Sequence, residues 1–175
     1  MIKIEPGITS FLHFIRKEIF YIMIKPIETK YDFYLAGPFF NEQQINMQEK
    51  IEDYMALRGK HCFSPRLDAG VLGENPTLED MNRVFRADLD AINQCKALFA
   101  NVSFRDTGTS VEIGYALSRD IPVILFWNEH IHDSKTVNLM IASACGGKYI
   151  ANWTQLSDYL DTGVLPENDL KFKVD

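Results

Sequence analysis

Two acidic residues enclose a run of small residues in the segment 106–116. Asp106 opens the segment, Gly108 lets the backbone turn closely, and Glu112 follows between two β-branched residues at the start of a predicted helix. A glutamate there is partly desolvated, which raises its pKa and removes the hydration that would weaken it as a nucleophile. The helix N-terminus opposes the rise by favouring the anion. Glu112 is therefore a candidate nucleophile; an ordinary first-turn glutamate is the alternative.

A third carboxylate belongs to the predicted helix upstream. Asp88 lies at the edge of the apolar face of that helix, and Asp90 lies toward solvent. The apolar face comprises Met81, Val84, Phe85, Leu89 and Ile92. Carboxylates that converge on one cleft have their pKa values pushed apart, so that one stays protonated while another is ionised. Cleavage of a glycosidic bond needs this division: a nucleophile for the anomeric carbon and a proton for the leaving group.

The elements that must position these residues alternate in type. Short apolar runs alternate with longer segments of helical period, which is typical of βαβ units and a parallel sheet. Strands are predicted at residues 33–36, 61–64, 97–102, 122–127 and 148–151. Helices are predicted at residues 41–58, 77–93, 110–118, 136–144 and 154–160, with a loop at 66–76. The pattern predicts an α/β fold: a single-domain, flavodoxin-like open parallel five-stranded sheet with helices on both faces. Ligands bind such sheets beyond the carboxyl ends of the strands.

The loop after the first predicted strand lies at that edge. It contains Gly37 and Pro38 but no GxGxxG pattern, and the proline removes a backbone donor that a phosphate-binding loop would use. A dinucleotide site is therefore not expected. Phe39 and Phe40 offer either a stacking surface for a flat base or a plug for the end of the sheet.

Composition narrows the function classes. The chain has 175 residues, a net charge of −6 and no basic run, so nucleic-acid backbone binding is not expected. The three cysteines and four histidines form no zinc-ligand pattern. The cysteines are odd in number and far apart, which is typical of reduced thiols in a cytoplasmic protein. Residues 1–30 are predicted to form an N-terminal extension, because charges interrupt its apolar stretches too often for a membrane span and its pattern is unlike that of a signal peptide. Residues 31–175 are predicted to form the single domain.

Several of these motifs together resemble one enzyme family. Residues 34–40, Asp88, Asp106 with Gly108, residues 112–116 and residues 138–140 resemble nucleoside 2-deoxyribosyltransferases, in order, across about residues 31–160. The resemblance implies a cytoplasmic enzyme of nucleotide salvage that exchanges the base of a 2′-deoxynucleoside for another purine or pyrimidine. It implies no metal and no organic cofactor. A 2′-deoxy sugar suits carboxylate catalysis because no electron-withdrawing 2′-hydroxyl destabilises an oxocarbenium-like transition state.

The resemblance also implies roles for the matching residues. Glu112 would form a covalent deoxyribosyl intermediate, which water resolves slowly when no acceptor base is present, and Tyr34 would hold Glu112 by a hydrogen bond. Asp88 and Asp106 would bind the edge of the base and supply or accept the proton on its ring nitrogen. Asn138 would bind the sugar 5′-hydroxyl, reaching across a subunit interface of a homo-oligomer with shared active sites. The substrate-binding set is expected to comprise Asn138, Gly37, Phe39, Phe40 and Gly108.

Two other functions remain open. A 2′-deoxynucleoside 5′-monophosphate N-glycosidase would use the same scaffold and would need a phosphate site, for which the candidates are Ser64, Arg66, Arg83 and Ser143. Asn138 suits a neutral 5′-hydroxyl better than a phosphate and favours the transferase. A non-catalytic nucleotide-sensing module would use the acids only as hydrogen-bond partners.

Overall fold

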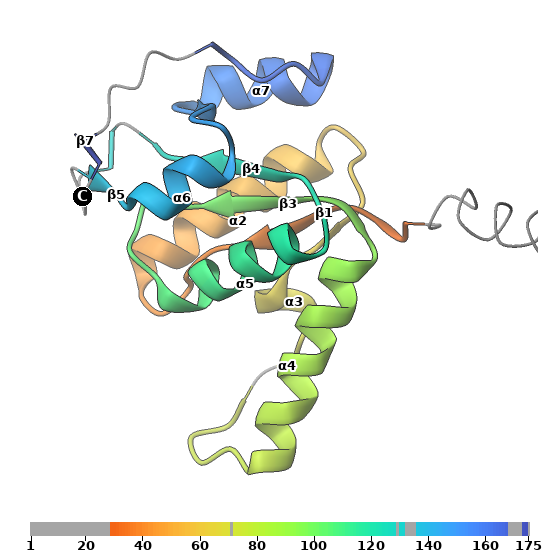
Figure 1. Ribbon diagram of the computed structural model, residues 1–175. Coiled ribbons are helices and arrows are strands. Elements are labelled where there is room, and N and C mark those ends of the chain that lie inside the picture. The colour runs from red at the N-terminus through yellow and green to blue at the C-terminus, as the bar shows by residue number, and fades with distance from the viewer. Residues whose placement is uncertain (1–28, 71, 129, 132–135, 168–172, 175) are drawn as a thin grey trace, which may run out of the picture.

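The fold is known from a computed structural model, which describes residues 29–70, 72–128, 130–131, 136–167 and 173–174 (Figure 1). Apart from its last two residues, the predicted N-terminal extension lies outside the described residues. No helix in the described ranges is both long and apolar enough to cross a membrane.

Five parallel strands form the central sheet, as the sequence predicts. They follow the order β2-β1-β3-β4-β6, so the chain winds outward from β1 in both directions. Their bounds are β1 Tyr31–Ala36, β2 Cys62–Phe63, β3 Cys95–Asn101, β4 Val123–Phe126 and β6 Tyr149–Ile150. The strand order changes direction beside β1 and β3, and ligands bind doubly wound sheets at such a point. The predicted fold class is confirmed.

Helices cover both faces of this sheet. Residues of α4 (Leu78–Asn93), α5 (Thr107–Ser118) and α6 (Leu139–Ala144) enter the core on one face, together with Tyr34 of β1. Residues of α2 (Glu42–Ala56) and α7 (Trp153–Thr162) enter the core on the other face, together with Phe33. Tyr34 and Phe33 point to opposite faces because side chains alternate along a strand.

Three of the sequence-based predictions differ from the structure by more than one or two residues at an element boundary. The helix predicted from residue 110 begins at Thr107, because the side chain of Asp106 accepts from the backbone of Thr109 and caps it. The helix predicted for residues 136–144 is wrong at its start. Thr136–Val137 is strand β5, which pairs with β7 (Lys173–Val174), and Asn138 then caps α6. The loop predicted at residues 66–76 contains a short helix, α3 (Pro65–Asp68).

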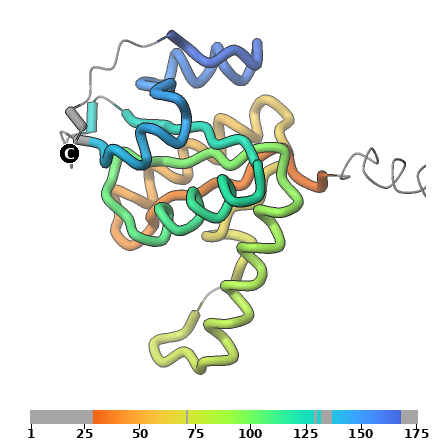
Figure 2. Tube along the Cα trace, in the orientation of Figure 1, coloured from red at the N-terminus to blue at the C-terminus, as the bar shows by residue number. Residues whose placement is uncertain are grey.

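Helix α4 projects away from the body of the domain (Figures 1 and 2). Its start is as predicted, because Thr77 and Asp80 form a reciprocal capping box. Its predicted apolar face is only partly used: Ala91 and Ile92 are its buried residues, whereas Phe85 is 54% exposed. The apolar pattern therefore predicts the helix correctly but overestimates how much of it packs on its own sheet.

Candidate active site

A hydrogen bond between Tyr34 and Glu112 lies at the centre of the candidate site. The Tyr34 hydroxyl donates to Glu112 Oε1 at 2.6 Å, joining strand β1 to the second turn of α5. Tyr34 is fully buried, and its ring stacks on Phe63 of β2 with centroids 5.7 Å apart. Because the phenol cannot swing away, it holds the glutamate in one orientation.

Burial dominates the electrostatics of Glu112. Desolvation raises its pKa to about 8, the hydrogen bond from Tyr34 opposes this rise, and the charges of Asp88 and Asp106 add to it. Burial and the charge of Glu112 also raise the pKa of Tyr34 far above its usual range, so the phenol stays a donor. The arrangement gives a poorly solvated carboxylate with one fixed donor, which is suited to nucleophilic attack once ionised.

Asp88 approaches the same place from α4. Its charge affects both Tyr34 and Glu112, and desolvation raises its own pKa to about 6. Its Oδ1 atom is buried and has no hydrogen-bond partner among the described residues. Buried polar atoms of folded proteins are nearly always paired. An unpaired carboxylate oxygen beside Glu112 is therefore suited to accept a donor, or to carry a proton, when a ligand is bound.

Asp106 serves the fold as well as the site. Its Oδ2 accepts from the Thr109 backbone N at 2.6 Å and from the Thr109 hydroxyl at 2.7 Å, which caps α5. A Cβ at Gly108 would lie 3.2 Å from that same oxygen, so a glycine leaves room for the capping carboxylate. Gly108 therefore has a structural part in the cap. The other carboxylate oxygen of Asp106, Oδ1, takes no part in the cap bonds to Thr109.

The site residues predicted from the sequence lie on two different sides of helix α5. A cavity of about 690 Å³ lies between α5 and α6, and both Asp106 and Asn138 line it. Tyr34, Asp88 and Glu112 are not among its lining residues. Asn138 is exposed, and its Oδ1 accepts from the backbone N of Met140 at the start of α6. Within one chain, the structure thus groups Tyr34 and Asp88 with Glu112 and places Asn138 at the cavity. Asp106 belongs to both groups, because it lines the cavity and its charge acts on Glu112.

The loop after β1 lies against α2 rather than closing the sheet. Phe39 and Phe40 stack on each other with centroids 5.5 Å apart, and Phe40 is 75% exposed. A ring so exposed does not plug the end of the sheet, and it remains available as a stacking surface. Gly37 is buried, and a Cβ there would lie 2.6 Å from Gln48 Oε1, so a larger residue would displace the Gln48 amide.

Two glutamines of α2, which sequence reasoning missed, anchor this loop. Gln44 Oε1 accepts from the Phe40 backbone N at 2.9 Å, and Gln48 Nε2 donates to the Leu35 carbonyl at 3.2 Å. Both side chains are buried. They are four residues apart, as neighbours on one face of a helix are. Their spacing was the available signal, but a glutamine pair on a helix is more often solvent-exposed.

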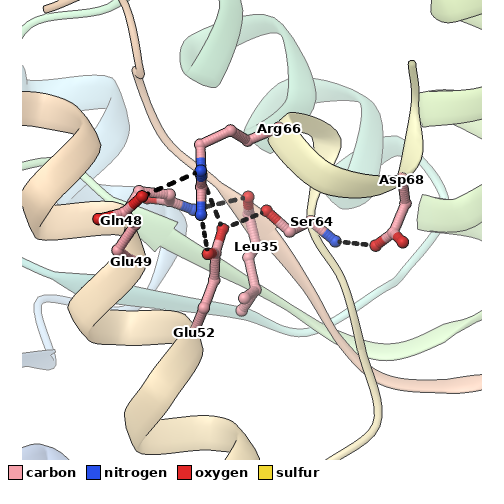
Figure 3. A network of polar contacts seen from close by, with 7 residues as sticks. All are labelled: Leu35, Gln48, Glu49, Glu52, Ser64, Arg66 and Asp68. Carbon is pink, nitrogen blue, oxygen red and sulfur yellow. Dashed lines mark hydrogen bonds and ion pairs between the residues drawn. The ribbon is translucent and has the colours of Figure 1, made fainter. Parts of the chain in front are cut away.

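The residues proposed for a phosphate site are already bound to other groups. Figure 3 shows Arg66 against two glutamates of α2, with Ser64 on the same carboxylate as Arg66. Arg66 pairs with Glu52 through two nitrogens and with Glu49 at 3.2 Å, and the Ser64 hydroxyl donates to Glu52 at 2.6 Å. A phosphate at this place would have to displace both glutamates and would meet their charge.

Arg83 is engaged as well. Its guanidinium contacts the Ala69 carbonyl at 3.4 Å and Asp80 at 3.9 Å. Ser143 is exposed near the C-terminal end of α6. The four residues are thus committed to local contacts or face solvent in this structure.

Comparison with solved structures agrees with this architecture. A 2-deoxyribosyltransferase from Bacillus psychrosaccharolyticus is 32% identical, with a TM-score of 0.64, over 73% of this chain and 90% of that chain. A conserved protein from Enterococcus faecalis V583 (18% identity, TM-score 0.62) and a 2-desoxiribosyltransferase from Leishmania mexicana (17%, TM-score 0.53) share the fold, each over 75% of this chain and 98% of theirs.

Sequence comparison identifies the family. No curated protein matches this sequence. The family model for nucleoside 2-deoxyribosyltransferase matches residues 33–140, which include Tyr34, Asp88, Asp106, Glu112 and Asn138. That match covers more than half of the chain. The chain therefore belongs to the nucleoside 2-deoxyribosyltransferase family.

Proposed function

We propose that this protein transfers the 2-deoxyribosyl group of a 2′-deoxynucleoside to another nucleobase through a covalent intermediate on Glu112. Membership of the family and the likeness to a 2-deoxyribosyltransferase support a deoxyribosyltransferase-type activity. The observation that carries the finer proposal is the partly buried carboxylate of Glu112, held by the Tyr34 hydroxyl at 2.6 Å and close enough to Asp88 to feel its charge.

The first half-reaction breaks the glycosidic bond. Ionised Glu112 attacks C1′ of the sugar, the C1′–N bond breaks with its electron pair passing to the base, and Asp88 gives that nitrogen a proton. Asp106 binds the edge of the base through the oxygen that its cap leaves free. Tyr34 holds the attacking carboxylate in line and favours its anionic form.

The second half-reaction reverses the first with a different base. An acceptor nitrogen attacks C1′, the ester bond to Glu112 breaks, and Asp88 or Asp106 takes the proton that the acceptor loses. Two displacements at C1′ retain its configuration. Water replaces the base slowly when no acceptor is present, which yields free 2-deoxyribose.

The position of Asn138 is the reason that the proposal includes an oligomer. Within one chain Asn138 lies on the α6 side of α5, with the cavity between the two helices, rather than with Tyr34 and Asp88. Supply of Asn138 to the 5′-hydroxyl site of a neighbouring subunit accounts for that separation. The proposal therefore includes a homo-oligomer with shared active sites, free in the cytoplasm and acting in nucleotide salvage.

The rival hydrolase would bind a 5′-phosphate in the same region. The Ser64 and Arg66 contacts count against it, because Glu52 and Glu49 already neutralise the arginine. Burial of a phosphate next to those glutamates would be opposed by like charge. The exposed amide of Asn138 matches a neutral hydroxyl, as the transferase requires.

The decisive experiment is base exchange. Purified protein is mixed with deoxyadenosine and free cytosine, or with deoxycytidine and free adenine, and the exchanged nucleoside is measured by chromatography. Exchange with the wild-type protein and its loss by at least ~10³-fold in Glu112→Ala are expected, because the variant lacks the carboxylate that Tyr34 holds and that forms the proposed intermediate. Nucleoside binding by Glu112→Ala, measured by calorimetry, should persist.

The same assay separates the alternatives. Turnover of deoxycytidine monophosphate or deoxyadenosine monophosphate to free base, without nucleoside exchange, would establish the hydrolase. Binding without any turnover would establish the sensing module. Intact-mass spectrometry of enzyme quenched during turnover should show a deoxyribosyl adduct that Glu112→Gln lacks.

A further inference from the structure

A tyrosine of the motif that carries Glu112 has no part in the reaction proposed above. Tyr115 is three residues after Glu112 and lies at the boundary between α5 and α4. Its hydroxyl accepts a hydrogen bond from Asn93 Nδ2 at 2.8 Å. Arg119 lies next to it, with Nε 3.4 Å from the hydroxyl and the guanidinium 5.5 Å from the ring centroid. The Asn93–Tyr115 hydrogen bond therefore joins α4 directly to α5.

This bond connects the same two helices that carry the reacting carboxylates. Glu112 and Tyr115 are three residues apart on α5, so they are neighbours along one side of that helix. Asp88 and Asn93 are five residues apart on α4, about 7.5 Å along its axis at 1.5 Å per residue. The Asn93–Tyr115 bond thus lies about one helical turn from the place where Asp88 approaches Glu112.

Helix α4 depends on this end for its position. Ala91 and Ile92 are its buried residues, Val84 packs partly buried against the same core, and the start of the helix projects away from the body (Figure 1). A helix of 16 residues is about 24 Å long. A small change of tilt at its anchored end therefore moves Asp88 relative to Glu112, while the sheet and α5 stay in place.

We propose that Asn93 and Tyr115 are positioning residues whose hydrogen bond sets the separation of Asp88 from Glu112. This inference rests on the proposed function, since it assigns the two carboxylates to one reaction. A misplacement of about 1 Å costs up to about 100-fold in rate when reacting groups must be aligned. Loss of the bond should therefore reduce kcat by about 10-fold and leave KM within about two-fold, because neither residue contacts the substrate.

The test is a double-mutant cycle with Tyr115→Phe, Asn93→Ala and the double variant. Tyr115→Phe keeps the ring that packs on the core and removes only the accepting oxygen. Since each single change breaks the same bond, the double variant should lose no more kcat than either single variant. Arg119→Ala is the matched control: it removes the other neighbour of the Tyr115 hydroxyl, keeps the Asn93 bond, and should retain wild-type kcat.

The pH dependence gives a readout that general loosening of the fold would not move. Burial raises the pKa of Glu112, the hydrogen bond from Tyr34 opposes the rise, and the charges of Asp88 and Asp106 add to it. Of these groups, Asp88 is the one that α4 carries. If the two carboxylates move apart, that contribution weakens, and the alkaline limb of the kcat/KM profile should shift to lower pH in both single variants. Thermal melting of each variant shows whether it is folded.

Several outcomes would overturn the inference. Wild-type kcat in both single variants, losses that multiply in the double variant, an unmoved alkaline limb, or an equal loss in Arg119→Ala would each contradict it, provided the wild-type protein exchanges bases. A wild-type protein without turnover would instead contradict the proposed function and remove the basis of this inference with it. If Tyr115→Phe does not fold, Asn93→Ala and Arg119→Ala decide the question alone.

Discussion

At the scale of single residues, the site depends on where one proton resides. Glu112 and Asp88 are both carboxyls removed from water, with pKa values of about 8 and about 6. Between those values the pair carries one proton and one negative charge. In the free chain these values place the proton on Glu112 and the charge on Asp88. The proposed reaction uses the reverse form of the same one-proton pair, with the charge on Glu112 and the proton on Asp88, and the hydrogen bond from Tyr34 stabilises the ionised Glu112 in that form.

A bell-shaped pH profile follows from this pair. Both pKa values are raised, so protonation below about pH 6 leaves no ionised nucleophile, and ionisation above about pH 8 leaves no acid. The value of kcat/KM for base exchange should therefore be greatest between those limits and fall about tenfold per pH unit well outside them. Steady-state exchange from pH 4 to pH 10 measures it.

The control for the profile is Asp88→Asn, which cannot supply the proton. Its alkaline limb should disappear, because no acid remains to ionise, and its residual acid limb should follow the pKa of Glu112 without the contribution of the Asp88 charge. A wild-type profile that is flat from pH 5 to pH 9 would contradict the assignment of the proton to this pair.

At the scale of elements, the start of α5 combines stability with function. The capping residue of the helix is Asp106, which is also the proposed partner of the base. A cap fixes the first turn of the helix, and Glu112 follows in the second turn. Substitution of Asp106 should consequently affect both the free energy of unfolding and the turnover, and the two effects can be separated.

We expect Asp106→Asn to keep the cap and Asp106→Ala to lose it. Asparagine caps helices as well as aspartate does, whereas alanine at a cap costs about 1 kcal/mol. Both variants should lose base exchange, about 10-fold or more, because neither has the carboxylate. Urea unfolding gives the stability and the exchange assay gives kcat/KM. Full activity in Asp106→Asn would show that the carboxylate acts only as a cap.

At the scale of the whole molecule, Asn138 is separated from the Tyr34–Glu112 pair within one chain. A cavity of about 690 Å³ lies between α5 and α6. Exposed residues at the start of α6 line part of it. One of them, Met140, is 77% exposed. If a neighbouring subunit uses this segment, the activity belongs to the assembly and not to one chain.

Mixing two inactive variants tests this directly. Glu112→Ala and Asn138→Ala should each be impaired alone. After mixing and subunit exchange, a mixed dimer contains one site with wild-type Glu112 and the partner's wild-type Asn138, so about a quarter of the activity should return. Glu112→Ala mixed with Tyr34→Phe is the control without rescue, because both residues serve the same chain's site. No recovery in the first mixture would place Asn138 in its own chain's site.

The sequence by itself determined the fold and most of the candidate residues. The alternation of apolar runs and helical periods predicted five parallel strands, because backbone hydrogen bonding and burial impose those periods locally. The Thr77–Asp80 box is likewise local, and its pattern is visible in the sequence. The resemblance of the motifs predicted the family, and the match over residues 33–140 confirmed it.

Only the tertiary structure decided which of these residues meet. The Tyr34–Glu112 bond joins residues 78 positions apart, and the Asn93–Tyr115 bond joins two helices whose separation no local pattern encodes. The same holds for the exposed half of α4 and for Asn138, which begins a helix after a strand where one continuous helix was predicted. Local periodicity reports which side chains avoid water, whereas the partners that they find depend on how distant elements pack.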